Sequence, residues 1–584
     1  MKHIFPFVIL AIILYFSSCA NQGSPSGGPR DTIPPTLLES NPPHKSKNYK
    51  KQVFEFTFDE RINADQLRTK MNITPHTDNK FKVLVKKDIL NITFDGTFDD
   101  STTYTFNFAD GVGDLTEKNP VINFTYAFST GAIIDSIFVN GRIRDLNNNE
   151  PLKEILVALY SIDDSLNLFT GKPRYFTHTD EDGYYKIENI KAYNYRIYAY
   201  DDQDKNLKNN PQKEKHGFIA DTLNLYTSKD SVNILLQLID ASELKFIRAK
   251  NTGIYFDVLY NKFIKNYSIS KIDSANQNDI PAHSFFKENT IIRFYPDGSI
   301  PIEKDSLHLQ IQSNDSLGNS IIDSVYVLFK ETKRKAESFQ YTISPSSKFK
   351  IQNNIKFNLE FSKPIKKINL DSLILSYDTL KSNNIPDSIL KWNYNRTQMT
   401  FTLPLDKNFI PNKIETNQKK QMKLDSIAQG KTTHTDTTSH KKRLPQASSI
   451  KNKVTLRTGL GAFISIENDT TEATERSYEF LLEEKTGKIN GTIETDHKSY
   501  FFQLVDSKYS VIAQLKNPKN FKFHNVEPGK YTFRVLIDEN NDGIWSPGNI
   551  LKNIQQEPIL FPLPFSDLKA GWEQDLSGEN KITF

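Results

Sequence analysis

Short segments in which apolar and polar residues alternate recur along the chain. The clearest spans residues 54–58, where Phe occupies every second position, and a polar corner then leads to Ile62. Alternation with a period of two predicts a β-strand with one buried face. The same arrangement returns in residues 256–260 and 357–361, each followed by a polar corner and an isoleucine. We therefore expect three related β units.

A second alternating segment completes each of these units. These segments cover residues 104–108, 307–311 and 478–482. Short strands at such intervals are typical of β-sandwich domains of about 100 residues.

A different repeat lies between and after these units. Residues 185–190 align without a gap with residues 521–526, and the alignment continues from 195–199 to 531–535. An Asn-Gly pair precedes each copy, Asn140-Gly141 in one and Asn490-Gly491 in the other, and we expect each pair to start a strand. The sequence thus predicts two further β modules.

The first unit carries motifs that resemble a known family. Residues 31–36, the Asn41-Pro42-Pro43 triplet and residues 56–62 are similar to the bacterial Ig-like domain first described in S-layer proteins. The resemblance extends to residues 242–331, through the loop at 315–319, and to residues 336–483. It implies non-enzymatic spacer or adhesive domains with no catalytic residues.

The other repeat resembles the carboxypeptidase regulatory-like, or transthyretin-like, β-sandwich. Residues 179–185 match its tight turn, in which Asp182-Gly183 suits a positive φ. We assign residues 135–238 and 486–584 to two such modules. The resemblance implies accessory or stalk domains.

The N-terminus has the features of an export signal. Lys2 and His3 precede an apolar run at residues 4–16 that is shorter than the about 20 residues a membrane-spanning helix needs. Cys19, the single cysteine, follows, and residues 16–19 resemble a bacterial lipobox. The resemblance implies a signal peptide at 1–18 and a lipidated tether at 19–35, with palmitate or a similar acyl chain on Cys19. The alternative is ordinary cleavage near Ala20.

Composition and charge narrow the function classes. The 584-residue chain holds 40 Phe and 25 Tyr, which favours β structure, and its net charge of +4 is too small to indicate nucleic-acid binding. A polar, basic stretch at 411–453 interrupts the third unit and is expected to be a disordered insertion. Contact of this stretch with anionic lipid is the alternative.

One loop has oxygen side chains at the spacing of a calcium-binding loop. Asp538, Asn540 and Asp542 alternate and precede Gly543, as in the first half of an EF-hand. The twelfth position is Asn549 rather than a glutamate, so a polar loop of Asx-turns is the competing interpretation. We expect no other cofactor. Metallopeptidase, phosphate-loop and serine-hydrolase motifs are missing, so an enzyme is not expected.

Together these patterns predict an all-β chain of serial β-sandwich domains. The expected order is signal peptide 1–18, tether 19–35, Ig-like 36–130, transthyretin-like 135–238, Ig-like 242–331, Ig-like 336–483 and transthyretin-like 486–584. The predicted function is a lipid-anchored spacer or adhesion scaffold of the cell envelope, in the outer membrane of a Gram-negative bacterium. Its partners would be the bilayer, through Cys19, and an unidentified protein or glycan. The alternative is a carbohydrate-binding lipoprotein of a nutrient-uptake system.

Overall fold

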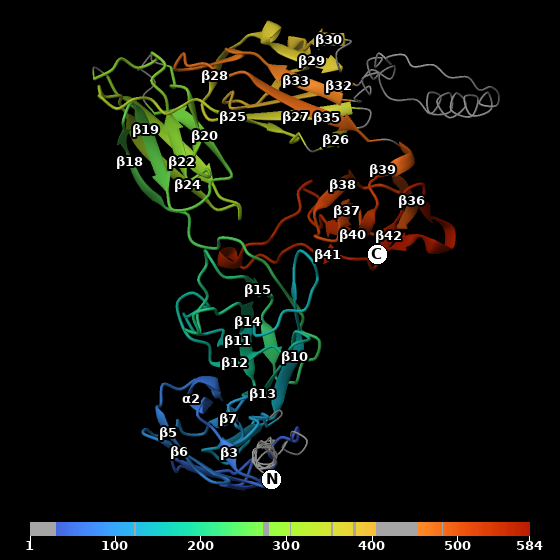
Figure 1. Cartoon of the computed structure of the whole chain (residues 1–584). Helices are drawn as coiled ribbons and strands as arrows, with labels where there is room; N and C mark the ends of the chain where they lie inside the picture. Colours follow the sequence, from blue (N-terminus) through green and yellow to red (C-terminus); the bar gives the residue numbers. More distant parts are fainter. Residues whose placement is uncertain are drawn as a thin grey trace, which may run out of the picture. The chain divides into compact units, whose positions relative to one another are not determined.

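The computed structural model of the chain describes residues 31–121, 124–272, 279–303, 305–347, 349–351, 354–377, 381–404, 453–481 and 483–584 (Figure 1). These residues form two compact units. Unit 1 holds the described residues up to Arg144 together with 151–209 and 221–234, and unit 2 holds residues 145–150, 210–220 and those from Leu235 onward. Strands dominate both units, and the described residues include one short α-helix, α2 (Leu67–Lys70).

We name the three related units repeat 1 (36–130), repeat 2 (242–331) and repeat 3 (336–483). Repeat 1 contains two main sheets and a short ladder. Its strands are β1 (Leu37–Asn41), β2 (Val53–Phe58), β3 (Ile62–Asn63), β4 (Asn72–Thr74), β5 (Phe81–Lys86), β6 (Ile89–Phe94), β7 (Thr103–Asn107), β8 (Gly113–Asp114) and β9 (Thr125–Ser129). The first sheet has the order β1-β2-β6-β5 and the second β4-β7-β9, while β3 pairs with β8.

Repeat 2 is built in the same way. Its strands are β18 (Phe246–Thr252), β19 (Tyr255–Tyr260), β20 (Asn266–Lys271), β21 (His283–Phe286), β22 (Ile291–Phe294), β23 (Leu307–Asn314) and β24 (Ser320–Val327). Its sheets have the orders β18-β19-β22-β21 and β20-β23-β24.

Repeat 3 adds strands to the same plan. They are β25 (Tyr341–Ser344), β26 (Lys350–Ile351), β27 (Asn354–Phe361), β28 (Ile365–Ile368), β29 (Leu373–Tyr377), β30 (Lys381–Asn384), β31 (Lys391–Trp392), β32 (Gln398–Pro404), β33 (Lys453–Thr458), β34 (Phe463–Ser465) and β35 (Thr474–Phe480). Its first sheet is β25-β27-β32-β31, and the second, β26-β35-β33-β29-β30, contains the three-strand order of the other repeats.

The predicted buried faces of the repeats are confirmed. Phe54, Phe56 and Phe58 are almost completely buried, whereas Val53 beside them is half exposed. The isoleucine after each polar corner, at 62, 264 and 365, is buried as well. Each repeat therefore has its own apolar core between its two sheets.

One predicted equivalence between the repeats is wrong. We expected residues 478–482 to correspond to residues 104–108 and 307–311, which fall in β7 and β23. The strand order shows that β33 is the counterpart of β7 and β23, and that β35 matches β9 and β24. Because β33 directly follows a long polar stretch, its short apolar pattern was hidden by that stretch. Apart from Lys453, the first residue of β33, the predicted insertion at 411–453 lies outside the described residues.

The two remaining modules, module A (135–238) and module B (486–584), share strand pairing. Module A contains β10 (Ile137–Asp145), β11 (Leu156–Ser161), β12 (Tyr175–His178), β13 (Tyr184–Ile190), β14 (Tyr193–Tyr200), β15 (His216–Phe218), β16 (Leu223–Leu225) and β17 (Ile234–Leu236). Module B contains β36 (Gly487–Glu494), β37 (Tyr500–Asp506), β38 (Val511–Lys516), β39 (Asn520–Val526), β40 (Gly529–Ile537), β41 (Ile559–Leu560), β42 (Ser566–Leu568), β43 (Glu573–Leu576) and β44 (Ile582–Thr583).

The pairing register is the same in both modules. Gly141 of β10 pairs with Tyr185 of β13, and Gly491 of β36 pairs with Phe521 of β39. In both ladders a bulge separates the first paired residue from the rest. The aligned sequences thus adopt the same local structure, as the repeat predicted.

The two Asn-Gly pairs do not start strands, contrary to our expectation. Each lies inside its strand, where another segment approaches the glycine closely. A Cβ on Gly141 would come within 2.0 Å of the Val232 carbonyl oxygen, and one on Gly491 within 2.6 Å of the Leu576 carbonyl oxygen. Glycine is needed at these positions for close backbone approach rather than for a turn. Gly183 does have the predicted positive φ, at 70°.

Buried tyrosines fix loops in the repeats and the modules. In repeats 1 and 3, the hydroxyls of Tyr126 and Tyr478 each donate to the carbonyl of a proline that follows the first strand, at 2.9 Å. In the modules, Tyr195 and Tyr531 each donate to a carbonyl four residues earlier, at 2.9 and 2.8 Å. These bonds satisfy hydroxyls that would otherwise be buried without a partner.

Candidate functional site

The predicted anchor, Cys19, lies outside the described residues. Within the described part of the chain, helices are too short and too polar to cross a bilayer. Lipidation at Cys19 therefore stays a prediction from the sequence.

The predicted calcium ligands of module B come together in the loop after β40. The backbone N–H of Asp542 donates both to Asp538 Oδ1, at 3.1 Å, and to Asn540 Oδ1, at 2.8 Å. The N–H of Gly543 donates to the other oxygen of Asp538, and the N–H of Ile544 donates to Asp542. The loop thus consists of Asx-turns, as the competing interpretation expected.

The electrostatics of this loop depend on hydrogen bonding. Asp538 is buried, and the hydroxyl of Ser499 donates to it at 2.6 Å. This bond and the loop N–H donors hold the pKa of Asp538 below its usual value. Lys516 lies beside the loop and lowers the same pKa further. Asp538 Oδ2 already accepts two hydrogen bonds, from Ser499 and Gly543. Asp538 Oδ1, Asn540 Oδ1 and the two Asp542 oxygens each accept one and keep a lone pair that a cation could use, but a bound cation would face the charge of Lys516. Calcium binding stays a prediction.

The sequence analysis did not identify Glu557, which supports this loop. Glu557 is buried, and its two carboxylate oxygens accept the N–H groups of Asn540, at 3.3 Å, and Ser546, at 2.7 Å. The indole N–H of Trp545 donates to the Glu557 carbonyl at 3.1 Å, so the tryptophan packs into the module. Glu557 is separated from the motif in sequence, and no spacing rule points to it.

The equivalent loop of module A has a similar network. The Asp202 carboxylate accepts the N–H groups of Asn206, at 3.0 Å, and Leu207, at 2.9 Å. Burial, together with the nearby Asp204, raises the pKa of Asp202, the opposite direction from Asp538. The two aligned loops therefore differ in charge environment although both use Asx-turns.

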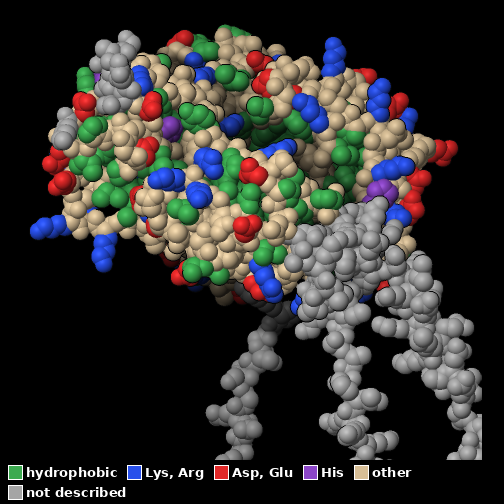
Figure 2. Space-filling view, turned by 90° about the horizontal axis from the view of Figure 1, so that it is seen from above, with side chains coloured by type: hydrophobic (Ala, Val, Ile, Leu, Met, Phe, Trp, Pro, Cys, Tyr) green, Lys and Arg blue, Asp and Glu red, His purple; other side chains and the backbone are tan. Residues whose placement is uncertain are grey.

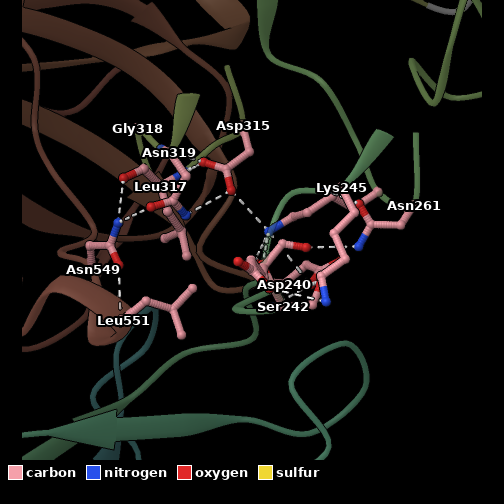
Figure 3. A network of polar contacts seen from close by, with 12 residues as sticks. Asp240, Ser242, Lys245, Asn261, Asp315, Leu317, Gly318, Asn319, Asn549 and Leu551 are labelled. Atoms are coloured by element: carbon pink, nitrogen blue, oxygen red, sulfur yellow. Dashed lines mark hydrogen bonds and ion pairs between the residues drawn. The ribbon is translucent and has the colours of Figure 1, made fainter. Parts of the chain in front are cut away.

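The position-twelve residue of the module B loop has a different role from an ion ligand. The side-chain amide of Asn549 donates to the Leu317 carbonyl, at 3.0 Å, and to Asn319 Oδ1, at 2.9 Å (Figure 3). Its own oxygen accepts the N–H groups of Leu551 and Lys552. Asn549 thus joins module B to the loop of repeat 2 that the Ig-like resemblance singled out.

That loop, residues 315–319, is centred on a buried carboxylate. Asp315 accepts the N–H groups of Leu317 and Asn319 at 2.9 and 2.8 Å (Figure 3). Lys262, from the polar corner, donates to Asp315 at 3.0 Å and to the carbonyls of Asp240 and Ser242. Burial alone would raise the pKa of Asp315, but the bonds from Asn319 and Lys262 outweigh it and hold the pKa below its usual value.

Repeat 3 places a lysine at the same corner. The ammonium of Lys363 is buried and contacts the carboxylates of Glu467 and Asp469. In this loop Ser465 replaces the first aspartate, and its N–H bonds to the carbonyl of Asp469 as Asp315 does to that of Asn319. The charge partner has therefore moved along the loop while the ion pair has been kept.

The described residues of repeat 1 do not form this ion pair. Glu60 occupies the corner position, and Asp114 opens the loop and accepts the N–H groups of residues 116–119 at 2.6–3.0 Å. Burial, followed by the charge of Asp114 and other acids, raises the pKa of Glu60. Burial opposes ionisation of Asp114, but the four N–H donors outweigh it and lower its pKa.

The surface carries charges of both signs. On the face shown in Figure 2, basic and acidic side chains are interspersed, with hydrophobic side chains between them. This distribution agrees with the small net charge of the chain.

Comparison with known proteins identifies one domain family. Residues 31–130 match the bacterial Ig-like domain family, which covers repeat 1. The chain matches no curated protein.

Several solved structures are similar over parts of the chain. The N-terminal part of the bacterial S-layer protein SbsC shares 15% identity with a TM-score of 0.14, over 29% of this chain and 40% of that one. A longer SbsC structure shares 10% identity with a TM-score of 0.14, over 86% and 64% of the two chains. BcpA, the major pilin subunit of Bacillus cereus, shares 10% identity with a TM-score of 0.13, over 77% and 100%. TM-scores this low do not establish a common arrangement of domains.

Proposed function

We propose that the protein is a lipid-anchored scaffold of the cell envelope, in which serial β-sandwich domains act as a spacer and present an interaction surface. The observation that carries this proposal is the set of polar contacts that join the domains of unit 2. Arg293 of repeat 2 pairs with Glu337 of repeat 3 at 2.9 Å, and Lys350 of repeat 3 pairs with Glu527 of module B at 3.0 Å. Asn549 connects module B to repeat 2.

Contacts of this kind favour a structural role. Arg293 is almost completely buried, bonds bidentately to Asp257, and lies over the rings of Tyr255 and Phe286. These contacts, all within repeat 2, hold the guanidinium in one orientation because its planar fork matches a carboxylate and its faces stack on rings, and Nη1 is then placed to reach Glu337 of repeat 3. A spacer has to hold its domains in register, whereas independent domains on flexible linkers would not need these bonds.

The anchor part of the proposal rests on the sequence around Cys19. Each buried acyl CH₂ contributes about 0.8 kcal/mol, so two or three chains would hold the protein firmly in a bilayer. The tether at 19–35 would separate the first domain from the membrane. Domains 135–238 and 486–584 act in this proposal as transthyretin-like stalk modules, and no catalytic role is assigned.

The anchor is tested by moving the only thiol. Cells expressing the wild type should incorporate labelled palmitate into the protein and retain it in the outer-membrane fraction. Cys19→Ser should abolish both, and a Cys19→Ser/Ser24→Cys double variant should restore neither, because lipidation requires the cysteine at the end of the signal. Label in the double variant, or membrane retention of Cys19→Ser, would contradict the anchor. Protease treatment of intact cells would then show which membrane face carries the domains.

Calcium at the module B loop is a separate part of the proposal. Asp538, Asn540 and Asp542 would supply side-chain oxygens, and water would complete the shell because only two of them carry charge. At about tenfold excess over Kd, binding adds roughly 1.4 kcal/mol to stability. Millimolar Ca²⁺ should then raise the melting temperature of the full chain relative to chelator, and Asp542→Ala should remove the difference. Identical wild-type curves in both buffers would favour the Asx-turn interpretation.

A further inference from the structure

A cleft lies between repeat 2 and repeat 3, inside unit 2. Strands β20 and β21 of repeat 2 form one wall, and the turn between β31 and β32 of repeat 3 forms the other. The volume of the cleft is about 430 Å³, within the range of small-molecule sites. Ligand sites occur preferentially at such interfaces between domains.

Three aromatic side chains meet in the cleft. The ring of His283 lies 5.6 Å from that of Tyr267 and 6.1 Å from that of Tyr394. Tyr394 is 90% exposed, although it belongs to a turn that contacts the other domain. An apolar ring left in water at the mouth of a cleft costs free energy that a ligand with an apolar face would recover.

His283 offers a hydrogen-bond acceptor to the cleft. Its side chain is nine-tenths buried, and Nδ1 lies 2.9 Å from the Pro281 carbonyl oxygen. Because a carbonyl only accepts, Nδ1 carries the proton and Nε2 of the neutral ring keeps its lone pair. Burial lowers the pKa of His283, which keeps the ring neutral. Among the described residues, Nε2 has no hydrogen-bond partner.

Tyr267 offers a donor beside this acceptor. The amide of Asn395 donates to the Tyr267 hydroxyl oxygen at 2.8 Å, so the O–H proton of Tyr267 is left for another acceptor. Burial raises the pKa of Tyr267, and the hydroxyl therefore stays protonated. The Asn395 carbonyl oxygen and the amide of Asn266 add further neutral polar groups to the lining.

The charge of the lining restricts the class of ligand. Lys265 is the one charged side chain among the described lining residues, and it is exposed at the edge. An anionic ligand would need more than one such cation, and a cationic ligand would need a carboxylate. Neutral donors, neutral acceptors and an exposed ring suit a molecule with many hydroxyl groups and an apolar C–H face.

From this geometry we infer that the cleft between Tyr267, His283 and Tyr394 binds a neutral saccharide. One sugar face would cover the ring of Tyr394, one hydroxyl would donate to His283 Nε2, and a second sugar oxygen would accept from the Tyr267 hydroxyl. This site would give the scaffold a glycan partner. It does not depend on the lipid anchor, because its residues all belong to repeats 2 and 3.

The test is binding of the full-length protein to a printed array of neutral, sialylated and sulfated oligosaccharides, followed by titration with the methyl glycoside of each sugar that binds. Neutral oligosaccharides should bind. Tyr394→Ala should weaken the titrated affinity by at least about tenfold, because it removes both the buried apolar area and the contact with the ring. Tyr267→Phe, which removes only the hydroxyl, should weaken it about fivefold.

Matched controls separate this site from a general loss of fold. Tyr226, 62% exposed and in unit 1, provides the control variant Tyr226→Ala, which should bind as the wild type does. Amide hydrogen exchange of β20 and β21 should be unchanged in Tyr394→Ala. The inference is overturned if no neutral oligosaccharide binds, if only sialylated or sulfated ones bind, or if Tyr394→Ala leaves the affinity unchanged.

Discussion

The polar corners of repeats 1 and 2 use one backbone arrangement with opposite charges. In both, an aspartate opens the loop, accepts N–H groups from the next residues, and is almost completely buried. Repeat 2 places the ammonium of Lys262 against this carboxylate, whereas repeat 1 places Glu60 at the same corner. The backbone donors alone are thus enough to hold Asp114 ionised, and the lysine of repeat 2 is an addition to that arrangement.

This difference has a physical consequence for stability. Removing one partner of a buried ion pair leaves an uncompensated charge, which costs more than the pair contributes. The stability of repeat 2 therefore depends on Lys262, whereas the stability of repeat 1 depends on no cation at the equivalent corner.

The largest expected effect follows from removing that lysine. Lys262→Met should destabilise repeat 2 by about 3 kcal/mol, because Asp315 would stay buried without its counter-charge. Hydrogen exchange of β19 and β23 in the full chain measures the loss. Lys245→Met, at an exposed pair in the same repeat, should change stability by less than about 0.5 kcal/mol. A double variant with Asp315→Asn should recover part of the loss. A Lys262→Met chain within about 1 kcal/mol of wild type would show that the backbone donors suffice in repeat 2 as well.

A smaller loss of stability is expected where module B contacts the same loop, at residues 317 and 319. Asn549→Ala should cost about 1–2 kcal/mol, because it removes two bonds to residues 317 and 319 and the cap of the turn at 550–552. Hydrogen exchange of the Leu317 and Asn319 amides should accelerate. The amides of the equivalent loop in repeat 1, at 114–119, should exchange as in the wild type and serve as an internal reference. Asn549→Asp keeps the cap and loses only the donors, so it should show an intermediate effect. Unchanged exchange in both variants would mean that the domains of unit 2 are not coupled through this loop.

The smallest expected effect is a gain in the stability of repeat 1. Glu60→Lys in repeat 1 should add at most about 0.5–1 kcal/mol by placing an ammonium near Asp114 at a partly exposed position. The sign of the pH dependence distinguishes the two side chains. The pKa of folded Glu60 lies above its usual 4.5, so the folded state binds the extra proton and wild-type stability falls as pH rises through that region. Asp114, with a lowered pKa, loses its contribution as pH falls.

The measurement is the exchange of β2 and β7 amides between about pH 2 and 7, which covers the titration of both glutamate and an aspartate with a lowered pKa. In the wild type, Glu60 makes stability fall as pH rises, and this fall should disappear in Glu60→Lys. Asp114 makes stability fall as pH is lowered, and this loss of stability should remain in the variant. A variant less stable than wild type at pH 7 would show that the corner of repeat 1 cannot accommodate the cation used by the other repeats.

Much of the fold followed from the sequence because strand patterns are local. The alternation at 54–58 and the glycine of the 182–183 turn predicted their structures correctly, since neighbouring residues determine both. β33 was missed because an adjacent polar stretch masked a short strand. The internal glycines 141 and 491 were misread because their reason lies in a distant segment that passes close to them.

The sites could be predicted only where their groups are close in sequence. Asp538, Asn540 and Asp542 share a loop, and their mutual contacts could be expected. The ion pair of Lys262 was not predicted, because its partner Asp315 is far away along the chain. The cleft combines Tyr267 and His283 with the 393–395 turn, and Glu557 supports its loop from beyond the motif. These residues are brought together by sheet packing, which no sequence spacing records.

The buried tyrosines give the protein a built-in optical reporter. Phenols in water ionise near pH 10 and change their ultraviolet absorbance as they do so. Burial raises the pKa of Tyr126 and Tyr195, and that of Tyr478 to about 12. While their domains are folded, these phenols therefore do not ionise near pH 10 and do not contribute to the absorbance change there. Their delayed ionisation marks the moment at which each hydroxyl leaves its carbonyl partner. Because absorbance sums over the 25 tyrosines of the chain, the delayed part of the titration can report the loss of folded structure without a label.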